Sequence, residues 1–352
     1  MHSQTVFRDM LCQNQMSNRE GAMARMYDAR GNIYNVVAPE ALRQQGIDVP
    51  DQADRAAQTR EDWALAAIEA CCAWAPGTQP PGSKDHCSDG LLVGPFQSSP
   101  PFDLLIVNTD GTLAERSGNG LTIFSQALSD QGLFPSDEAC VLRVHHDKSD
   151  TPSPGQTSVK AAQVEGAQGF WLDLGQPGFG PSAVSAVDVE AVQLNGRELS
   201  HVRQLSALNG AWSRSQFARV GNPHCVTLVD SAEALPGNEQ MRQSPLAEGL
   251  MRIAYAMPAG AGKPCPAGIN LQWAMRESEG HVVARVFERG EGPTASSGTS
   301  ASAVACAAWR VGWVSAGEVK VVMPGGTAPI LLEEEQGELS RVSLFGTARL
   351  VR

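Results

Sequence analysis

Two short segments of the chain carry groups suited to binding a small anion. Ser117-Gly118 and Ser297-Gly298 each precede an apolar stretch with the pattern of a helix. The first amides of a helix have no partner within it and carry partial positive charge, and a glycine lets a ligand approach the backbone closely. One serine in such a place is usually only the N-cap of its helix. Because the arrangement occurs twice, we predict two halves of one pocket for a small carboxylate-bearing substrate.

The surroundings of these two turns repeat as well. Residues 108–120 read NTDGTLAERSGNG, and residues 288–300 read ERGEGPTASSGTS. In each, the end of an expected strand leads into a turn with glycine and threonine, then to the Ser-Gly pair, and then to a helix, Leu121–Leu128 or Ala301–Val311. This order predicts an internal pseudo-repeat, one copy in each of two domains, and 352 residues are enough for two cores.

Further polar groups lie at the ends of expected strands. Asn222 and His224 belong to a Gly-Asn-Pro-His segment, Asn270 ends a Gly-Ile-Asn segment, and Glu288-Arg289 precedes the second turn. The asparagines have an ordinary explanation as turn or cap residues. The Glu-Arg pair is equally typical of an exposed ion pair. Both explanations stay open beside a role in the pocket.

One motif points to a different class of site. Residues 290–295 fit GxGxxA between an expected strand and a helix, which is typical of a dinucleotide-binding turn. However, no acidic residue lies about 20 positions further on, and the chain lacks the regular strand-helix alternation of a parallel sheet. We therefore do not expect a nicotinamide or flavin site.

Composition excludes several classes of partner. The net charge of −11, from 27 basic and 38 acidic residues, opposes binding to nucleic acid or to an anionic membrane. No apolar stretch reaches the roughly 18–20 residues that span a bilayer, and the polar N-terminus lacks the apolar core of a secretion signal. The eight cysteines form no CxxC or Cys/His pattern, so we expect free, mostly buried thiols and no metal site. These features favour a cytoplasmic protein.

The expected elements indicate an α+β fold. Glycine and proline are abundant, with 35 and 22 residues, and strands outnumber helices. We predict a flexible N-terminal extension over residues 1–25, a first domain over 26–150 and a second over 151–339. The polar segment Asp147–Ser158 is the expected linker. A helix is expected over residues 61–74, and strands over 26–37, 91–93, 104–107, 169–174, 184–194, 225–229, 281–287, 318–323 and 341–351.

Taken together, the motifs resemble those of the diaminopimelate epimerase family. The resemblance runs from about Met26 to Arg352 and includes the spacing: nine positions from Asn108 to Ser117, eighteen from Asn270 to Glu288, and nine from Glu288 to Ser297. Its motifs are Arg30-Gly-Asn32, Ser88-Asp-Gly90, the two repeated segments, Gly221-Asn-Pro-His224, Gly268-Ile-Asn270, the MPGG at Met323 and the FG at Phe345.

The resemblance implies two pseudo-symmetric domains, each a curved sheet or barrel around a central helix, with the active site in the cleft between them. It also implies that the C-terminal strand, residues 340–352, joins the first domain. The implied activity is inversion at the α-carbon of an amino acid, diaminopimelate or a related small carboxylate, in lysine biosynthesis. No cofactor or metal is implied, and a homodimer is possible.

The resemblance also assigns roles to individual residues. Ser117 and Ser297 occupy the positions of the two family cysteines that remove and return the α-proton. His224 and Glu288 match the groups that adjust those thiols. Backbone amides for the substrate carboxylate would come from Gly118, Asn119, Gly298 and Thr299. The substrate amino and carboxylate groups would be held at Asn32, Asn108, Asn222, Asn270, Glu288 and Arg289.

The serine pair departs from the family at the centre of its chemistry. A thiol titrates near pH 8.5, whereas a serine hydroxyl is unreactive unless a neighbouring base activates it. His224 and Glu288 are therefore candidates for the true bases. Three alternatives follow: an epimerase in which the altered pair, natural or introduced, still works; a lyase or double-bond isomerase on the same scaffold; and a silent amino-acid-binding homologue.

Overall fold

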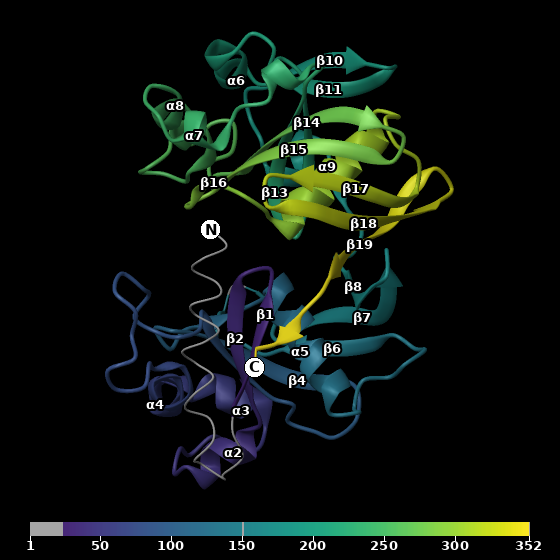
Figure 1. The fold of residues 1–352 in the computed structure, drawn as a ribbon. Helices are drawn as coiled ribbons and strands as arrows, with labels where there is room; N and C mark the ends of the chain where they lie inside the picture. The colour runs from purple at the N-terminus through teal and green to yellow at the C-terminus, as the bar shows by residue number, and fades with distance from the viewer. Residues whose placement is uncertain (1–23, 150, 352) are drawn as a thin grey trace. The chain divides into compact units, whose positions relative to one another are not determined.

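The computed structural model describes residues 24–149 and 151–351, and the contacts divide the chain into two units. Unit 1 holds the described residues up to Leu172 and from Gly346 onward, and unit 2 holds Asp173–Phe345. Figure 1 labels the elements of both units. Most of the predicted extension over residues 1–25 lies outside the described residues, because the description begins at residue 24.

Unit 1 is built on a curved sheet of short strands. The hairpin β1 (Arg25–Ala29) and β2 (Asn32–Val37) is followed by β3 (Gly90–Val93), which runs parallel to β2. The sheet continues through β4 (Phe102–Asn108), β5 (Leu113–Ala114), β6 (Cys140–Val144), β7 (Gly155–Val164) and β8 (Ala167–Asp173), and β20 (Arg349–Leu350) pairs with β1.

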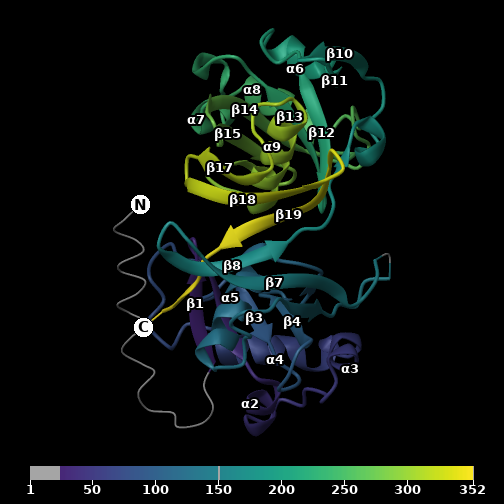
Figure 2. The ribbon, with the colours of Figure 1, turned by 90° about the vertical axis from the view of Figure 1, so that its right-hand side faces the viewer.

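Helices cover both faces of this sheet. The apolar helix α5 (Gly118–Asp130) packs on one face, with Leu92, Leu104 and Ile106 in its core. The other face is covered by three helices, α2 (Pro39–Gln44), α3 (Ala53–Gln58) and α4 (Arg60–Cys72), which lie together beside β3 and β4 (Figure 2). Strand residues alternate between the two faces, so α5 meets only every second side chain of each strand.

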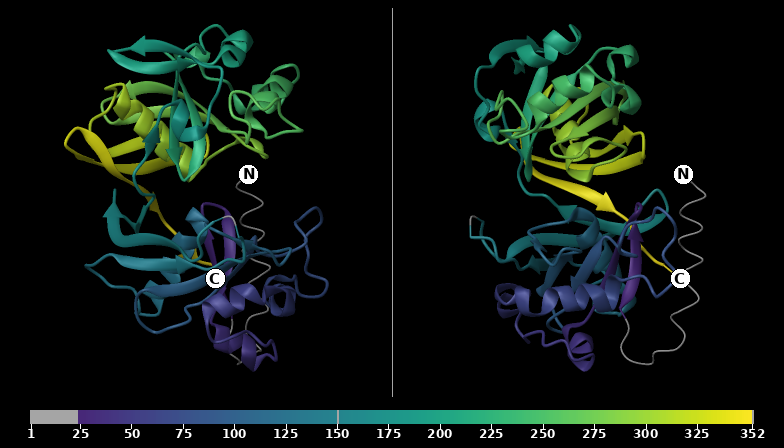
Figure 3. Two further views of the ribbon diagram at one scale, coloured as in Figure 1. Left: turned by 180° about the vertical axis from the view of Figure 1, so that it is seen from behind. Right: turned by 90° about the vertical axis from the view of Figure 1, so that its left-hand side faces the viewer.

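Unit 2 repeats this plan around α9 (Gly298–Arg310). The helix is buried along most of its length because alanine and small residues let the strands approach it closely (Figure 3). Its strands are β9 (Gly178–Phe179), β10 (Glu190–Leu194), β11 (Arg197–His201), β12 (Ser215–Val220), β13 (Asn222–Leu228), β14 (Asn270–Ser278), β15 (His281–Glu288), β16 (Gly292–Thr294), β17 (Gly317–Met323), β18 (Gly326–Glu335) and β19 (Glu338–Gly346).

The outer face of the unit 2 sheet has a separate core. It is formed with α6 (Arg203–Leu208), α7 (Asn238–Met241) and α8 (Leu246–Ala254), and it includes Trp212 and Trp273. Two short 3₁₀ turns, Pro181–Val184 and Ala232–Ala234, complete the elements of this unit. The predicted α+β class with two domains is confirmed.

The pseudo-repeat predicted from the sequence is present in the structure. Hairpin β1–β2 corresponds to β12–β13, β3 to β14, β4 to β15 and β5 to β16, with the same parallel or antiparallel pairing. The helices α5 and α9 both have 13 residues. Their N-caps also match: Ser117 has φ −145° and ψ 119°, and Ser297 has φ −153° and ψ 123°.

The domain limits differ from those expected. The boundary at 150/151 is wrong because β7 pairs with β6 and β8 pairs with β7, which extends the sheet of unit 1 and moves the boundary to 172/173. The expected linker Asp147–Ser158 runs into β7, which begins at Gly155. At the C-terminus only the segment from Gly346 belongs to unit 1, because β19 pairs with β18 in unit 2.

Candidate active site

In unit 2, four polar side chains lie around the first turn of α9. His224 pairs in register with Asn270, and Gln272 follows two residues later on the same face of β14. Their neighbours Cys225 and Leu271 belong to the core on the opposite face, so the polar set points toward α9. Glu288 ends the adjacent strand β15 on the same side, beyond Val286, which belongs to the α9 core.

Ser297 and Glu288 form a direct hydrogen bond. The Ser297 hydroxyl donates to Oε1 of Glu288 at 2.7 Å. Partial burial raises the pKa of the Glu288 carboxyl above its ordinary value, and the nearby Glu291 adds to this, while the bond from Ser297 opposes it. Because the Ser297 side chain is used in this way, it makes no capping bond to its own helix. A carboxylate with a raised pKa is the kind of group that proton abstraction needs.

His224 is fully buried beside this pair. Burial lowers its pKa to about 3, so the ring is neutral at ordinary pH. Nε2 of Gln272 donates both to Nδ1 of His224 at 3.0 Å and to Oγ of Ser300 at 3.0 Å. His224 is thereby tied to the first turn of α9 through Gln272. Nε2 of His224 is buried and has no hydrogen-bond partner among the described residues.

The remaining predicted residues of unit 2 fall into two groups. The amides of Gly298 and Thr299 precede the first intrahelical bond, from Ala301 N to the Ser297 carbonyl, so they are unpaired within the helix. Asn270 and Arg289 serve the local backbone: Oδ1 of Asn270 accepts from Arg289 N at 2.8 Å, and the Arg289 guanidinium donates to the Ala267 carbonyl. Asn222 is exposed at the start of β13.

Unit 1 presents the equivalent arrangement at α5. Tyr34, Gly90 and Asn108 lie side by side in register on β2, β3 and β4. Tyr34 belongs to the core around α5, which shows that this face meets the helix. The Asn108 amide donates to the hydroxyl of Thr112 at 3.0 Å and so braces the turn that leads to Ser117.

Ser117 is engaged differently from Ser297. Its hydroxyl accepts from the amide of Gly120 at 3.0 Å and therefore caps α5. The amides of Gly118 and Asn119 precede the first intrahelical bond of α5, from Leu121 N to the Ser117 carbonyl.

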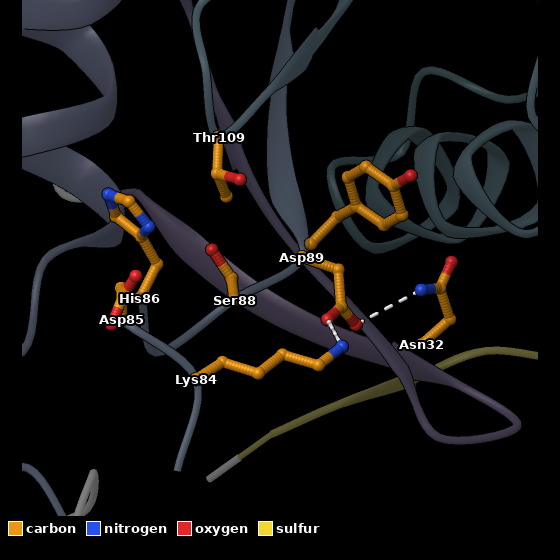
Figure 4. Close-up of a pocket in the computed structure, with 8 residues that line it drawn as sticks. Asn32, Lys84, Asp85, His86, Ser88, Asp89 and Thr109 are labelled. Carbon is orange, nitrogen blue, oxygen red and sulfur yellow. Dashed lines mark hydrogen bonds and ion pairs between the residues drawn. The ribbon is translucent and has the colours of Figure 1, made fainter.

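A pocket of about 510 Å³ opens beside these residues in unit 1. Figure 4 shows Asp89 between Lys84 and Asn32, each joined to one of its carboxylate oxygens. The lining residues are Asn32, Tyr34, Lys84, Asp85, His86, Ser88, Asp89 and Thr109. Asn32 was predicted from the sequence as a binding residue, but the charged loop around Lys84 and His86 was not.

The duplication makes residues of the two units correspond position by position. Asn108 and Glu288 both end a strand nine residues before the helix-capping serine. Asn32 and Asn222 both follow a glycine with positive φ and open the second strand of a hairpin. Two residues further on stand Tyr34 in unit 1 and His224 in unit 2. Tyr34 and Gln272 are not predicted by the sequence motifs, although the shared Gly-Asn start of the two strands is a signal for Tyr34.

Searches for other kinds of site gave no candidate in residues 24–149 and 151–351. Within that part of the chain, no three histidine, cysteine or acidic side chains are grouped as a metal site would need. None of the described helices is both long and apolar enough to cross a bilayer. Seven cysteines lie within this part of the chain; none of them forms a disulfide, and all are buried or half-buried.

Comparison with known proteins identifies the family. The family model described as diaminopimelate epimerase matches residues 216–351. The diaminopimelate epimerase of Ralstonia nicotianae is 30% identical over 269 residues, 75% of this chain and 80% of that protein. Diaminopimelate epimerase 2 of Nostoc sp. is 29% identical over 252 residues, 70% of this chain and 75% of that protein.

A solved structure shows the same fold at much lower sequence similarity. The PhzF-family phenazine biosynthesis protein of Bacillus anthracis superposes with a TM-score of 0.52 at 13% identity, covering 94% of this chain and 96% of that one. The two relatives from Ralstonia nicotianae and Nostoc sp. are epimerases by name. The chain belongs to the diaminopimelate epimerase family.

Proposed function

We propose that this protein is an isomerase that removes and returns the α-proton of an amino acid, diaminopimelate or a related small carboxylate. The proposal needs no cofactor, because the proton acceptor and the anion-binding amides all come from the chain. The family and the names of the relatives support the reaction class, and the departure at Ser117 and Ser297 concerns how it is carried out.

The observation that carries the proposal is the bond between Ser297 and Glu288. A serine hydroxyl alone is a poor proton acceptor, but a carboxylate 2.7 Å from it supplies one. Burial raises the pKa of Glu288 toward the range in which a carboxylate is an effective base. We therefore assign proton removal to Glu288, with Ser297 either transmitting the proton or holding the carboxylate.

The second candidate base, His224, fits less well. Its pKa of about 3 makes the ring weakly basic, and its Nδ1 is occupied by the bond from Gln272. A neutral imidazole in this position orders the turn through the chain from His224 to Ser300. We assign His224 a positioning role, with Gln272 as its partner.

Binding of a carboxylate is assigned to the unpaired amides at the start of a helix. Gly298 and Thr299 in unit 2, and Gly118 and Asn119 in unit 1, provide N–H groups at the positive ends of α9 and α5. Negative charge also accumulates on the substrate carboxylate when the α-proton leaves. The same amides thus stabilise the carbanion more than the ground state, which is what accelerates the step.

Exchange of the α-proton tests the proposal directly. Incubation with stereoisomers of diaminopimelate and with common amino acids in heavy water is expected to place deuterium at the α-carbon. Glu288→Gln should lower the exchange rate by about 10²-fold or more, the usual contribution of a positioned base. Glu291→Gln, which removes an exposed neighbouring carboxylate, is the matched control.

The outcomes separate the alternatives. Exchange that survives in the Glu288→Gln protein would remove Glu288 from the step. Absence of exchange with every substrate would overturn the epimerase assignment. Loss of water or migration of a double bond in a hydroxy or unsaturated acid would then indicate the lyase or double-bond isomerase on this scaffold, and stabilisation by a ligand without turnover would indicate a binding protein.

A further inference from the structure

The pocket of unit 1 shares no residue with the groups to which proton transfer is assigned above. Its volume of about 510 Å³ is within the range of roughly 300–1,000 Å³ that is usual for sites of small molecules. The lining comes from three segments of unit 1: the strand β2 with Asn32 and Tyr34, the loop residues 84–89 before β3, and Thr109 after β4. The pocket is therefore formed by unit 1 alone.

Asp89 places a fixed negative charge in the wall of this pocket. Its side chain is only 10% exposed. Oδ2 accepts a hydrogen bond from the Ile33 amide at 2.8 Å and another from Nδ2 of Asn32 at 3.0 Å. The Asp89 amide in turn donates to the Ile33 carbonyl at 2.6 Å. These bonds hold the carboxylate in place but bring no positive charge, which a buried carboxylate also needs.

The compensating charge comes from Lys84. Its Nζ lies 2.5 Å from Oδ1 of Asp89, and Oδ1 has no other hydrogen-bond partner among the described residues (Figure 4). The Lys84 side chain is 67% exposed, although its backbone carbonyl accepts from Nε1 of Trp74 at 2.9 Å and from Nε2 of Gln79 at 3.2 Å. The loop is therefore anchored, while the ammonium lies at the end of a flexible, solvated stem.

The exposure of Lys84 makes this ion pair easy to exchange. Water solvates the lysine ammonium well, so an ion pair with an exposed lysine has a small net free energy. The ammonium of a ligand presents the same charge and the same three N–H donors to Oδ1 as Lys84 does. Lys84 thus marks the position at which a ligand cation would bind Asp89.

The other charges of the pocket favour a cation over an anion. One lysine against the two carboxylates of Asp85 and Asp89 leaves a formal charge of −1 when His86 is neutral. An incoming carboxylate would be repelled by both aspartates, whereas an ammonium is attracted by both. The Thr109 hydroxyl lines the same space and can accept a further N–H (Figure 4).

We propose that this pocket binds the primary ammonium group of a small molecule, which takes the place of the Lys84 ammonium on Asp89 while Lys84 turns into solvent. Lys84 is then an internal competitor, and it lowers the affinity for the ligand by the fraction of molecules in which it occupies the carboxylate. The inference goes beyond the proposed function, because it concerns binding within unit 1 and holds whether or not an α-proton is moved.

Titration of the full chain with butylammonium tests the site. The amide resonance of Ile33, which donates to Asp89, reports occupancy in NMR spectra and should shift saturably. Two matched ligands define the chemistry: butyrate has the opposite charge, and butyltrimethylammonium has the charge but no N–H donor. Both should bind at least about tenfold more weakly, which is the usual cost of a lost hydrogen bond to a charged group.

Substitution of Lys84 gives the sharpest result, because the expected change is a gain of affinity. Lys84→Met removes the competing ammonium and keeps most of the stem, so the Kd for butylammonium should fall by about fivefold or more. Lys148→Met is the matched control, since Lys148 is an exposed lysine of unit 1 that pairs with Glu115 outside the pocket. Asp89→Asn should raise the Kd by about tenfold or more.

The contrary outcomes are specific. An unchanged or raised Kd in Lys84→Met would overturn the proposal, and this result does not depend on whether Asp89→Asn folds. Equal binding of butyltrimethylammonium would show only a general attraction of cations, and tighter binding of butyrate would make the pocket an anion site at Lys84; either result overturns the proposal, as does the absence of a saturable shift. None of these measurements involves α-proton exchange, so the proposed function stands or fails separately.

Discussion

Ser117 and Ser297 occupy equivalent positions, yet their hydroxyls do different things. Ser117 accepts from Gly120 and so satisfies one of the unpaired amides at the start of α5. Ser297 leaves its helix without a side-chain cap and donates to Glu288 instead. Ser117 thus stabilises its helix through an N-cap bond. Ser297 makes no such bond and instead donates a hydrogen bond to the Glu288 carboxylate.

This difference predicts unequal losses of stability for the two alanine substitutions. Ser117→Ala should lower the free energy of unfolding of unit 1 by about 0.5–2 kcal/mol, because the N-cap bond is lost. Ser297→Ala removes no cap and should have a smaller effect on stability. Urea denaturation of both variants measures this; equal losses would show that the two hydroxyls are used alike.

The sequence predicts site residues correctly where they lie at a fixed spacing within one strand and the turn that follows it. The nine-residue separations placed Asn108 before Ser117 and Glu288 before Ser297, and the structure brings Glu288 and Ser297 into contact. Tyr34 and Gln272 were missed because their positions depend on which strands are neighbours and in what register. Strand order and register depend on contacts between strands that are distant in sequence, and a local sequence pattern does not reveal them.

At the level of elements, the β2–β3 pair depends on one glycine. Gly90→Ala would bring a methyl group within 2.6 Å of the Val107 carbonyl oxygen and 2.8 Å of the Tyr34 ring. We expect a loss of about 1–3 kcal/mol in stability, typical of overpacking, because the Tyr34 ring or the strand must move to admit the methyl group.

Gly155→Ala provides the control for this change. Gly155 also lies on a strand of unit 1, but a Cβ there would come no closer than 3.6 Å to another atom. Thermal melts and α-proton exchange should be measured on both variants. Similar behaviour of the two would mean that the β2–β3 strands can separate to admit the methyl group.

Elements with a strong apolar pattern were predicted best. The two helices after the Ser-Gly turns and the strands at Leu91–Val93 and Leu104–Val107 all appear, with ends shifted by one to three residues. β18 was not predicted, because Pro329 and the glutamates at its end are untypical of a strand that pairs on both sides. Its ladder partners β17 and β19 decide its conformation, which is a tertiary effect.

For the whole molecule, the separate cores of the two units predict separate responses to acid. In unit 1, Asp103 lies in register with Arg143 on the β4–β6 pair and also contacts His145. Burial by itself would raise the pKa of Asp103, but the bonds from Arg143 and His145 outweigh it, and the pKa is lowered. The stabilisation is therefore present above the unfolded value near 3.9 and is lost as pH falls through the lower folded value.

Asp103→Asn tests this at the level of the two units. Near pH 6 the substitution should speed hydrogen exchange in β4 and β6 by about tenfold or more and leave α9 and β15 of unit 2 unchanged. The difference from wild type should shrink as the pH falls below about 4. Asp48→Asn, an exposed carboxylate of unit 1, is the control. Equal acceleration in both units would show that they unfold together.

The two-domain plan was predictable from length and from the repeated segments, but the boundary was not. A polar stretch with two prolines was taken as a linker, whereas the chain forms β7 and β8 before it leaves unit 1. A polar composition is typical of a linker, but a β-hairpin with one solvent-exposed face can have the same composition. Only the pairing with β6 shows which unit the segment belongs to.

The return of the chain to unit 1 has a consequence during protein synthesis. β1 leaves the ribosome before unit 2, yet its partner β20 follows the whole of unit 2, and Arg349 then binds Asp28 through its guanidinium. Unit 2 is one continuous stretch and can fold while translation proceeds. The edge of β1 that pairs with β20 therefore has no partner strand until residue 350 has been synthesised. Until then the sheet of unit 1 is incomplete, while unit 2 can already be folded.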